Sequence, residues 1–263
     1  MYKFDVEKIK NDLIQWLKDW ESKNAQGCNF VVGISGGKDS SVIAALLVQA
    51  FGKERVIGVL MPNGIQNDIN AAFQLVEFLD IKHTVIDISK AYKDILNSLF
   101  YCSHLGNMGR HIVPSEQAIT NLPPRIRMAT LYAVSQSLNG RVVGTDNASE
   151  AYIGYSTRWG DNVADLMPIL NLTSEEVVAV GDALGLPYEL THKVPADGLC
   201  GKTDEDNLGF TYEVLNKYIL TGECEDEEIK AKIDYLHNKN LFKLQPIPSF
   251  VPMGVRGYDE EIS

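Results

Sequence analysis

The sequence predicts an α/β protein with a doubly wound parallel sheet that is covered by helices on both faces. Over the first 145 residues, short apolar runs alternate with segments of helical periodicity, which is the pattern of successive parallel βαβ units. Runs such as NFVVGIS and RVIGVLM are almost continuously apolar, as expected of strands buried on both faces. Residues 173–263 show helical patterns without clear strands, so we expect a helical C-terminal part.

The expected elements follow one another in a regular order. In residues 5–22, apolar side chains recur at helical spacing, and Asp5 is suited to cap this helix. Gly52 is suited to end the next helix, and Asn67 or Asp68 to cap the one after it. Further helices are expected at 39–51, 67–79, 89–101 and about 123–138, and strands at 29–35, 55–61, 83–88 and 141–145.

This fold predicts where a functional site lies. Open parallel sheets bind their ligands beyond the carboxyl ends of the strands. The loops that follow residues 34, 61 and 145 emerge at that edge of the expected sheet. We therefore look for the chemistry in these three loops.

Length and composition indicate one globular domain spanning residues 1–263. The chain shows no internal repeat, no low-complexity stretch and no linker rich in Pro or Gly. No segment approaches the roughly 20 consecutive apolar residues that span a bilayer, and the charged N-terminus lacks the apolar core of a signal peptide. We therefore expect a cytoplasmic protein that does not associate with a membrane.

Charge and cysteine content narrow the expected partners. The formal net charge is −11, which argues against a broad surface for nucleic acid but leaves room for a locally positive pocket. The cysteines show no paired spacing, so neither a zinc site nor a disulfide framework is indicated. They are Cys28, Cys102, Cys200 and Cys224, and we interpret them as free thiols.

A glycine- and serine-rich loop follows the first expected strand. The segment from Gly33 to Ser41 reads GISGGKDSS. Its glycines permit a sharp turn with N–H groups facing an anion, its serines add hydroxyl donors, and the helix N-terminus adds partial positive charge. It is not a Walker A loop, because only three residues separate Gly33 from Gly37 and Asp39 follows the lysine. The simpler alternative is a turn that caps an ordinary helix.

Two longer stretches link the loop to a family. SGGKDSS resembles the SGGxDS signature of the N-type ATP pyrophosphatases, whose loop holds departing pyrophosphate. NLPPRIRMATLYAVSQ and VVGTDNASEAYIGYSTRWGDNVADLMP, within residues 121–168, closely resemble the ammonia-dependent NAD synthetases, as do LMPNGIQND and DGLCGKTDEDNLGFTYEVL. The resemblance spans about residues 29–250. It implies the adenine nucleotide alpha hydrolase-like version of the doubly wound fold.

The resemblance also implies a reaction. ATP would adenylate the carboxylate of nicotinic acid adenine dinucleotide, releasing pyrophosphate, and ammonia would then displace AMP to leave the amide, NAD. Mg²⁺ is the implied metal cofactor, and the implied assembly is a homodimer. The chain is filled by the synthetase match, so no glutaminase domain is expected and ammonia is the implied nitrogen donor.

The resemblance also implies roles for individual residues at the positions that match the family. Asp39 and Glu150 would bind Mg²⁺, and Asp161 would serve the ammonia step, with Ser35 and Lys38 as further catalytic residues of the loop. The dinucleotide would be held by Arg125, Arg158, Asp165 and Lys243. ATP would be held by Gly33, Ile34, Ser35, Gly36, Gly37, Lys38, Asp39, Ser40, Gln66 and Thr145.

Several of these residues have simpler interpretations. Glu150 is alternatively a solvated surface acid, but its place five residues past an apolar strand end favours metal binding. Asp161 lies in a Gly-Asp-Asn sequence that suits a turn, and we favour the ammonia role, which is compatible with it. For Arg127 a structural ion pair is the better interpretation.

Three aromatic side chains and two histidines complete the candidates. Tyr152, Tyr155 and Trp159 form either a stacking wall for the nicotinate ring or ordinary core. His104 and His111 are assigned no role, since no zinc-ligand spacing includes them.

The sequence departs from the family at several positions. Leu60 stands where the family usually has Arg, and Ser174 and Arg158 stand where Lys is common. The stretch Val194-Pro195-Ala196-Asp197 lacks the usual hydroxyl, with Lys193 or Lys202 as replacement charges, and Phe242 precedes Lys243 where a His-Lys pair is usual. The loop chemistry is intact, so we expect a divergent branch. The alternatives are another adenylating amidotransferase and a nucleotide-binding module without turnover.

Overall fold

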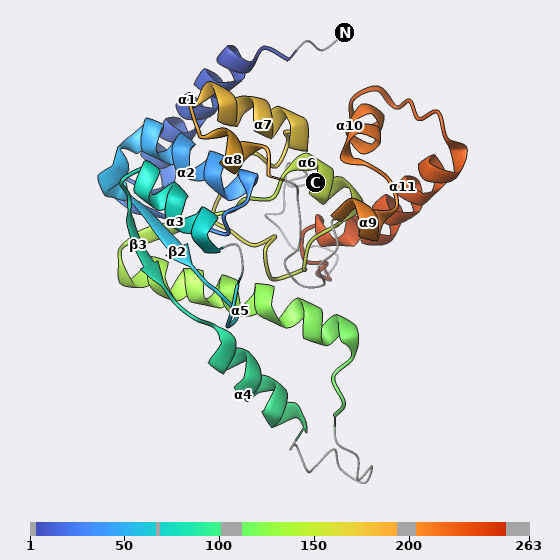
Figure 1. Cartoon of the computed structure of the whole chain (residues 1–263), viewed down its shortest axis with the longest axis horizontal. Helices are drawn as coiled ribbons and strands as arrows, with labels where there is room; N and C mark the ends of the chain where they lie inside the picture. Colours follow the sequence, from blue (N-terminus) through green and yellow to red (C-terminus); the bar gives the residue numbers. More distant parts are fainter. Residues whose placement is uncertain (1–3, 67–68, 101–111, 194–203, 251–263) are drawn as a thin grey trace.

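A four-stranded parallel sheet forms the centre of the fold (Figure 1). The computed structural model describes residues 4–66, 69–100, 112–193 and 204–250. The strands are β1 (Asn29–Gly33), β2 (Val56–Leu60), β3 (Lys82–Val85) and β4 (Gly140–Val143), in the spatial order β3-β2-β1-β4. All pairings are parallel, and Val31 lies between Ile57 and Val142. The strand order reverses between β1 and β4, which makes this the switch point where such sheets bind ligands.

Alternate residues of β1 enter two different cores, so both faces of the sheet are covered. Phe30 and Val32 pack with α2 (Lys38–Phe51) and its neighbours α1 (Val6–Asn24), α3 (Ile69–Phe78), α7 (Ser174–Ala183) and α8 (Tyr188–Thr191). Val31 faces the other way, where the cluster includes residues of α5 (Glu116–Ser137). The doubly wound α/β fold is therefore confirmed. Asp5 caps α1 as expected, since its carboxylate accepts the backbone N–H of Lys8 at 3.1 Å.

The helix α5 corrects one expectation. It begins after the N-cap Ser115 and runs through Pro123 and Pro124, whereas the sequence predicted a start at about residue 123. Two adjacent prolines resemble a helix start because they lack the N–H groups that are left over there. In this chain the helix continues on both sides of them. Its N-terminal half extends beyond the sheet beside α4 (Ser89–Phe100) (Figure 1).

The other boundaries lie close to expectation. The predicted cap at residues 67–68 lies outside the described residues, and so do Cys102, Cys200, His104 and His111. Gly52 ends α2 with φ of 82°, a left-handed conformation that suits glycine, before the short helix η1 (Lys53–Arg55). None of the helices in the described ranges is long and apolar enough to cross a bilayer.

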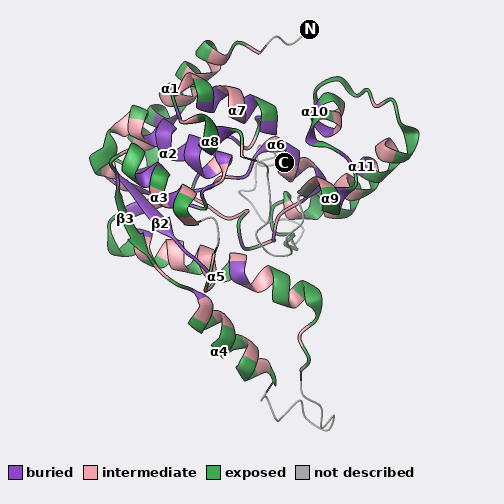
Figure 2. Cartoon of the chain, viewed as in Figure 1, coloured by how far each residue is buried: buried purple, intermediate pink, exposed green. Residues whose placement is uncertain are grey.

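All the regular structure described beyond residue 173 is helical, with turns and irregular segments between the helices. Its elements are α7, α8, α9 (Asp204–Leu208), α10 (Tyr212–Thr221), α11 (Glu227–Asn240) and η3 (Leu241–Lys243). A second apolar cluster forms where α9, α10 and α11 pack against α6 (Ala148–Ile153), with Ile153, Leu215 and Ile233 almost fully buried. Figure 2 shows α6 buried between this cluster and the rest of the fold. The short helix after β4 thus joins the sheet to the C-terminal helices.

Candidate active site

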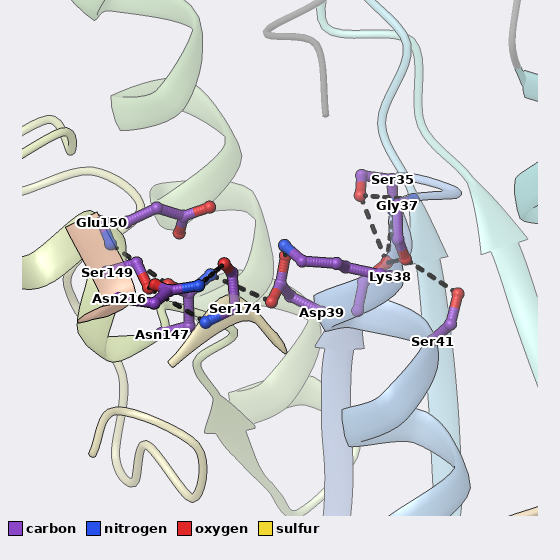
Figure 3. Close-up of polar contacts among 11 residues, drawn as sticks. Ser35, Gly37, Lys38, Asp39, Ser41, Asn147, Ser149, Glu150, Ser174 and Asn216 are labelled. Atoms are coloured by element: carbon purple, nitrogen blue, oxygen red, sulfur yellow. Dashed lines mark hydrogen bonds and ion pairs between the residues drawn. The ribbon is translucent and has the colours of Figure 1, made fainter. Parts of the chain in front are cut away.

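The loop after β1 is held in shape mainly by bonds within itself (Figure 3). The hydroxyls of Ser35 and Ser40 lie 3.2 Å apart, and the backbone N–H of Gly37 donates to Ser35 Oγ at 3.2 Å. Ser40 and Ser41 donate to the carbonyl of Gly37 at 3.1 and 2.8 Å. These contacts turn the chain from β1 into α2 with the first turn of the helix facing the loop. The arrangement has the form of an anion-binding helix N-terminus.

Gly36 explains why this loop needs glycine. Its φ is +80°, and a Cβ there would lie 2.9 Å from the backbone N of Ala72 and 3.0 Å from Cβ of Ala71. Both contacts come from α3, so the loop packs directly against the following helix. A side chain at this position would be strained by its own backbone and by its neighbours.

Asp39 connects the loop to the segment after β4. Its Oδ2 lies 2.7 Å from Lys38 Nζ, and its Oδ1 accepts a hydrogen bond from Asn147 Nδ2 at 3.0 Å. The side chains of Lys38 and Asp39 are only 7% and 18% exposed, so the ion pair is shielded from water. Asn147 in turn caps α6, because its Oδ1 accepts the backbone N–H of Glu150 at 3.1 Å. The two loops at the switch point are therefore joined through Asp39.

The residues present fit a magnesium ion that is completed by phosphate and water. Glu150 extends from the first turn of α6 toward the side of Asp39 and Lys38 (Figure 3). No group of three or more metal-binding side chains occurs among the described residues. Mg²⁺ commonly uses one or two carboxylates together with substrate phosphates and water, so a pair of acids is a suitable donor set. The side-chain ammonium group of Lys38 lies beside Asp39, so this carboxylate already pairs with a cation.

Asp146 is a site residue that sequence reasoning missed. It is 6% exposed and lies between Thr145 and Asn147, directly after β4. Burial raises the pKa of its carboxyl to about 7, and repulsion from Asp161 and Asp39 adds to the increase. A carboxyl at a strand's carboxyl end was visible in GTDN, but only the fold brings Asp161 and Asp39 to it.

Asp161 lies in a tight loop between α6 and the sheet. Its Oδ1 accepts the backbone N–H of Thr157 at 2.7 Å, so it stabilises a turn as the simpler interpretation supposed. Although the residue is exposed overall, neighbouring protein atoms desolvate its carboxyl and raise its pKa, while the bond from Thr157 acts in the opposite direction. Lys243 and Arg127 contribute opposing positive charge. Asp146 is thus the carboxyl on which the charges of both Asp161 and Asp39 act.

Arg125 and Arg158, two of the expected dinucleotide ligands, lie together. Arg125 Nε donates to the carbonyl of Arg158 at 3.3 Å. The Arg158 guanidinium lies 4.9 Å from the ring centres of both Trp159 and Phe242, and its buried Nε has no hydrogen-bond partner among the described residues. Trp159 has φ of +64°, a conformation that is uncommon outside glycine. Phe242, where the family usually has His, therefore supplies a stacking face for Arg158.

The other expected ligands of the dinucleotide also make contacts within the protein. Asp165 Oδ2 accepts the backbone N–H of Val142 at 2.7 Å, at the edge of β4 where Leu166 forms an isolated parallel bridge with Val143. Lys243 Nζ donates to the carbonyls of Gly154 and Ser156 at 2.7 and 2.8 Å, beyond the end of α6. Burial lowers the pKa of Lys243. Their substrate roles stay predictions.

The remaining candidates divide between loop and core. Thr145 follows β4 at the switch point, and Gln66 lies in the loop after β2. Arg127 Nε donates to the carbonyl of Met61 at 3.1 Å. This contact is structural, as expected, but its partner is a backbone carbonyl and not the acid of an ion pair. Residues 194–197 and Lys202 lie outside the described residues.

The three aromatic candidates differ in exposure. Tyr152 stacks on His237 with ring centres 4.2 Å apart and packs, like Tyr155, against the C-terminal cluster. Trp159 is 46% exposed. Trp159 is therefore the exposed member of the three, with the Arg158 guanidinium lying over its ring.

Fold and site together define a nucleotide-activating α/β protein, with a glycine-serine loop and two acids at the switch point of a parallel sheet. The family model described as NAD synthase matches residues 9–246. An NH(3)-dependent NAD(+) synthetase of Carboxydothermus hydrogenoformans is 39% identical over 223 residues, covering 84% of this chain and 88% of the relative. The chain therefore belongs to the NAD synthase family, which confirms the resemblance and makes it a ligase.

Solved structures agree with this assignment. An NMN synthetase from Francisella tularensis has a TM-score of 0.82 at 33% identity, covering 95% of this chain and 100% of the other. An NH3-dependent NAD synthetase from Campylobacter jejuni has a TM-score of 0.73 at 27% identity, with the same coverage of both chains. The expected fold is thus confirmed by comparison as well.

Proposed function

We propose that this protein amidates nicotinic acid adenine dinucleotide to NAD, using ATP to activate the carboxylate and ammonia as the nitrogen donor. We call the segment from Gly33 to Ser41 the phosphate loop. The observation that carries the proposal is the hydrogen bond between Asp39 of this loop and Asn147 of the segment that holds Glu150, in a chain of the NAD synthase family. Activation is needed because a carboxylate resists nucleophiles and hydroxide is a poor leaving group. Most of the catalysis is positioning and charge stabilisation.

The first half-reaction is adenylation. The loop from Gly33 to Ser41 holds the triphosphate through its N–H and hydroxyl groups, and Lys38 adds positive charge beside it. A carboxylate oxygen of the substrate attacks the α-phosphorus of ATP, and pyrophosphate leaves. Asp39 and Glu150 would hold Mg²⁺, which neutralises phosphate charge when bound. Arg125 and Arg158, which lie together, would bind phosphates of the dinucleotide.

The second half-reaction uses the acid group around Asp161. Ammonia attacks the activated carbonyl carbon, the bond to AMP breaks, and the nitrogen loses a proton. Most ammonia is ammonium at neutral pH, so a desolvated carboxylate suits both capture of the cation and removal of its proton. The raised pKa of Asp161 favours acceptance of that proton. The neighbouring carboxyl of Asp146, whose pKa is about 7, adds negative charge when it is ionised.

One assay tests the whole proposal. Purified protein with ATP, Mg²⁺, ammonium and nicotinic acid adenine dinucleotide should form AMP, pyrophosphate and NAD in equal amounts. Reactions without the dinucleotide should form none. ATP binding without AMP formation would contradict the proposal and favour a nucleotide-binding module. Replacing ammonium by glutamine should give no NAD, because the relatives that the chain matches over most of their length are NH(3)-dependent synthetases.

The mononucleotide is a second candidate substrate. The NMN synthetase from Francisella tularensis has a TM-score of 0.82 to this chain, so amidation of nicotinic acid mononucleotide is the chemically closest alternative. Competition between the two acids in one reaction measures the ratio of their kcat/KM values. A ratio that favours the mononucleotide would identify it, and not the dinucleotide, as the substrate. The proposed mechanism would be unchanged.

We propose that the protein is a cytoplasmic homodimer with one domain per chain. The homodimer is supported by the exposed arm that α4 and the N-terminal half of α5 form. No described residue of α4 is buried, and Ile95, Phe100 and Ile119 are each at least 40% exposed (Figure 2). A groove of about 470 Å³ runs between the two helices and includes Ile95, Leu122 and Arg125. An apolar surface of this kind suits a second copy.

Sedimentation analysis tests the assembly. Ile95→Asp should shift the protein toward monomer, whereas the matched change Leu220→Asp, at an exposed position of α10, should not. A monomeric parent, or equal behaviour of both variants, would contradict the proposed interface.

A further inference from the structure

Three buried polar side chains close a ring behind the proposed metal ligands. Ser149 Oγ donates to Asn216 Oδ1 at 2.5 Å, and Asn216 Nδ2 donates to Ser174 Oγ at 3.1 Å. The backbone N–H of Ser174 donates back to Ser149 Oγ at 2.9 Å, which completes the ring. We call Ser149, Ser174 and Asn216 the polar ring (Figure 3).

The polar ring is buried and joins three helices. The exposed fractions of Ser149, Ser174 and Asn216 are 0%, 5% and 1%. Buried polar groups are costly unless they are paired, and a closed set of hydrogen bonds specifies one arrangement of its members. Ser149 belongs to α6, Ser174 to α7 and Asn216 to α10, so the ring ties the helix after β4 to both parts of the C-terminal half.

The ring is directly connected to the phosphate side of the site. Ser149 precedes Glu150 in the first turn of α6, and Asn147, the N-cap of the same helix, binds Asp39. α6 has only six residues, and a helix this short has little stability of its own. The direction of Glu150 therefore depends on what anchors α6, and Ser149 is the polar anchor next to it.

We propose that the polar ring positions the divalent-cation site by fixing the helix that carries Glu150 relative to Asp39. Ser149 and Asn216 are positioning residues, because their side chains bond within the polar ring and act through Glu150. The inference rests on the proposed function in one respect, namely that Glu150 and Asp39 are the metal ligands. It adds that α10 takes part in metal binding through Asn216, which lies 66 residues beyond Glu150 in the sequence.

The ring offers a graded set of variants. Ser149→Ala removes both bonds of the residue beside Glu150, and Asn216→Leu removes the acceptor of Ser149 at similar volume. Ser174→Ala removes only the bond from Asn216 Nδ2 and leaves both bonds of Ser149 in place. All three variants lose buried hydrogen bonds, so each should melt several degrees lower.

The experiment measures Mn²⁺ binding by electron paramagnetic resonance, with the full chain and a non-cleavable α,β-methylene analogue of ATP. We expect Ser149→Ala and Asn216→Leu to weaken Mn²⁺ binding about tenfold or more, and Ser174→Ala by less than about threefold. Thr191→Val is the matched control, because it removes the bonds of a buried threonine hydroxyl to Asp182 and Tyr188, at the opposite end of α7 from Ser174. It should lower the melting temperature and leave Mn²⁺ binding unchanged.

Glu150→Gln separates the two levels of the argument. If Mn²⁺ binding weakens in Glu150→Gln but stays at the parent value in Ser149→Ala and Asn216→Leu, the positioning role is overturned and the metal assignment stands. Equal weakening in Thr191→Val would also overturn it, since general loss of stability would then explain the effect. Unchanged binding in Glu150→Gln would overturn both the metal assignment and the inference.

Discussion

The two loops that meet at the switch point are built in opposite ways. In the phosphate loop, the side-chain bonds of Ser35, Ser40 and Ser41 span two to five residues of sequence. In the segment from Asp146 to Glu150, the bonds of Asn147 and Ser149 to other side chains span 108 and 67 residues. The first loop carries its own geometry, whereas the second depends on helices from the rest of the chain. Damage to the first should therefore be local, and damage to the second should spread.

Asp39 belongs to both regions, so the largest effect is expected there. Asp39→Asn keeps the size of the side chain but removes the charge that faces Lys38 and the proposed metal. Turnover should fall by about 100-fold or more, roughly 3 kcal/mol of barrier, because a charge contact at the reacting phosphates is lost. Steady-state AMP formation measures this, with the exposed surface change Asp12→Asn as control. A loss below about threefold, under 1 kcal/mol, would end the metal assignment.

Asp161 tests whether the second region acts in one half-reaction only. In Asp161→Ala and Asp161→Asn, amide formation should fall by about 100-fold while pyrophosphate release falls far less. Asn retains an acceptor for the N–H of Thr157, so it separates loss of charge from loss of the turn. Rapid-quench measurements of both products give the two rates. Equal loss of both steps in the Asn variant would refute the ammonia role.

Asp146 should make the free energy of unfolding depend on pH. Its folded-state pKa of about 7 is above the ordinary value of 3.8, so the folded state binds the proton more tightly than the unfolded state. The resulting stabilisation is complete below about pH 4 and is lost as the pH rises toward 7. Between pH 5 and 7, the parent should lose about 2 kcal/mol of unfolding free energy relative to Asp146→Asn.

Urea denaturation at both pH values, in buffer with a chelator, measures the difference. Glu175→Gln, a change at an exposed acid in the first turn of α7, serves as the control. A pH dependence that is the same in the parent and in Asp146→Asn would contradict the assigned pKa.

At the glycines of the local loop, the expected effect is on stability alone. Gly36→Ala should cost about 1–3 kcal/mol of stability, because the residue has positive φ and its Cβ would press on α3. Gly37→Ala is the matched control, since its φ is −88° and the nearest atom to an added Cβ is Ser35 Oγ at 3.3 Å. Thermal denaturation should separate the two variants. Equal melting temperatures would show that the loop yields without strain.

The sequence by itself determined the features whose physics is local. Apolar runs predicted the strands, and SGGKDSS predicted a phosphate loop because its turn, its hydroxyl donors and its helix N-terminus lie within a few residues of one another. Pro123 and Pro124 show the limit of local reading, since tertiary packing carries α5 through a pair of residues that ordinarily mark a boundary.

Only the tertiary structure decided the second half of the site. Nothing around Asn216 or Ser174 in the sequence indicates a bond to the helix of Glu150, because hydrogen bonds between distant segments leave no periodic pattern. The raised pKa of Asp146 likewise arises from burial and from two acids that lie 15 and 107 residues away in the chain. Burial and electrostatic coupling depend on distances in space, and the fold sets those distances.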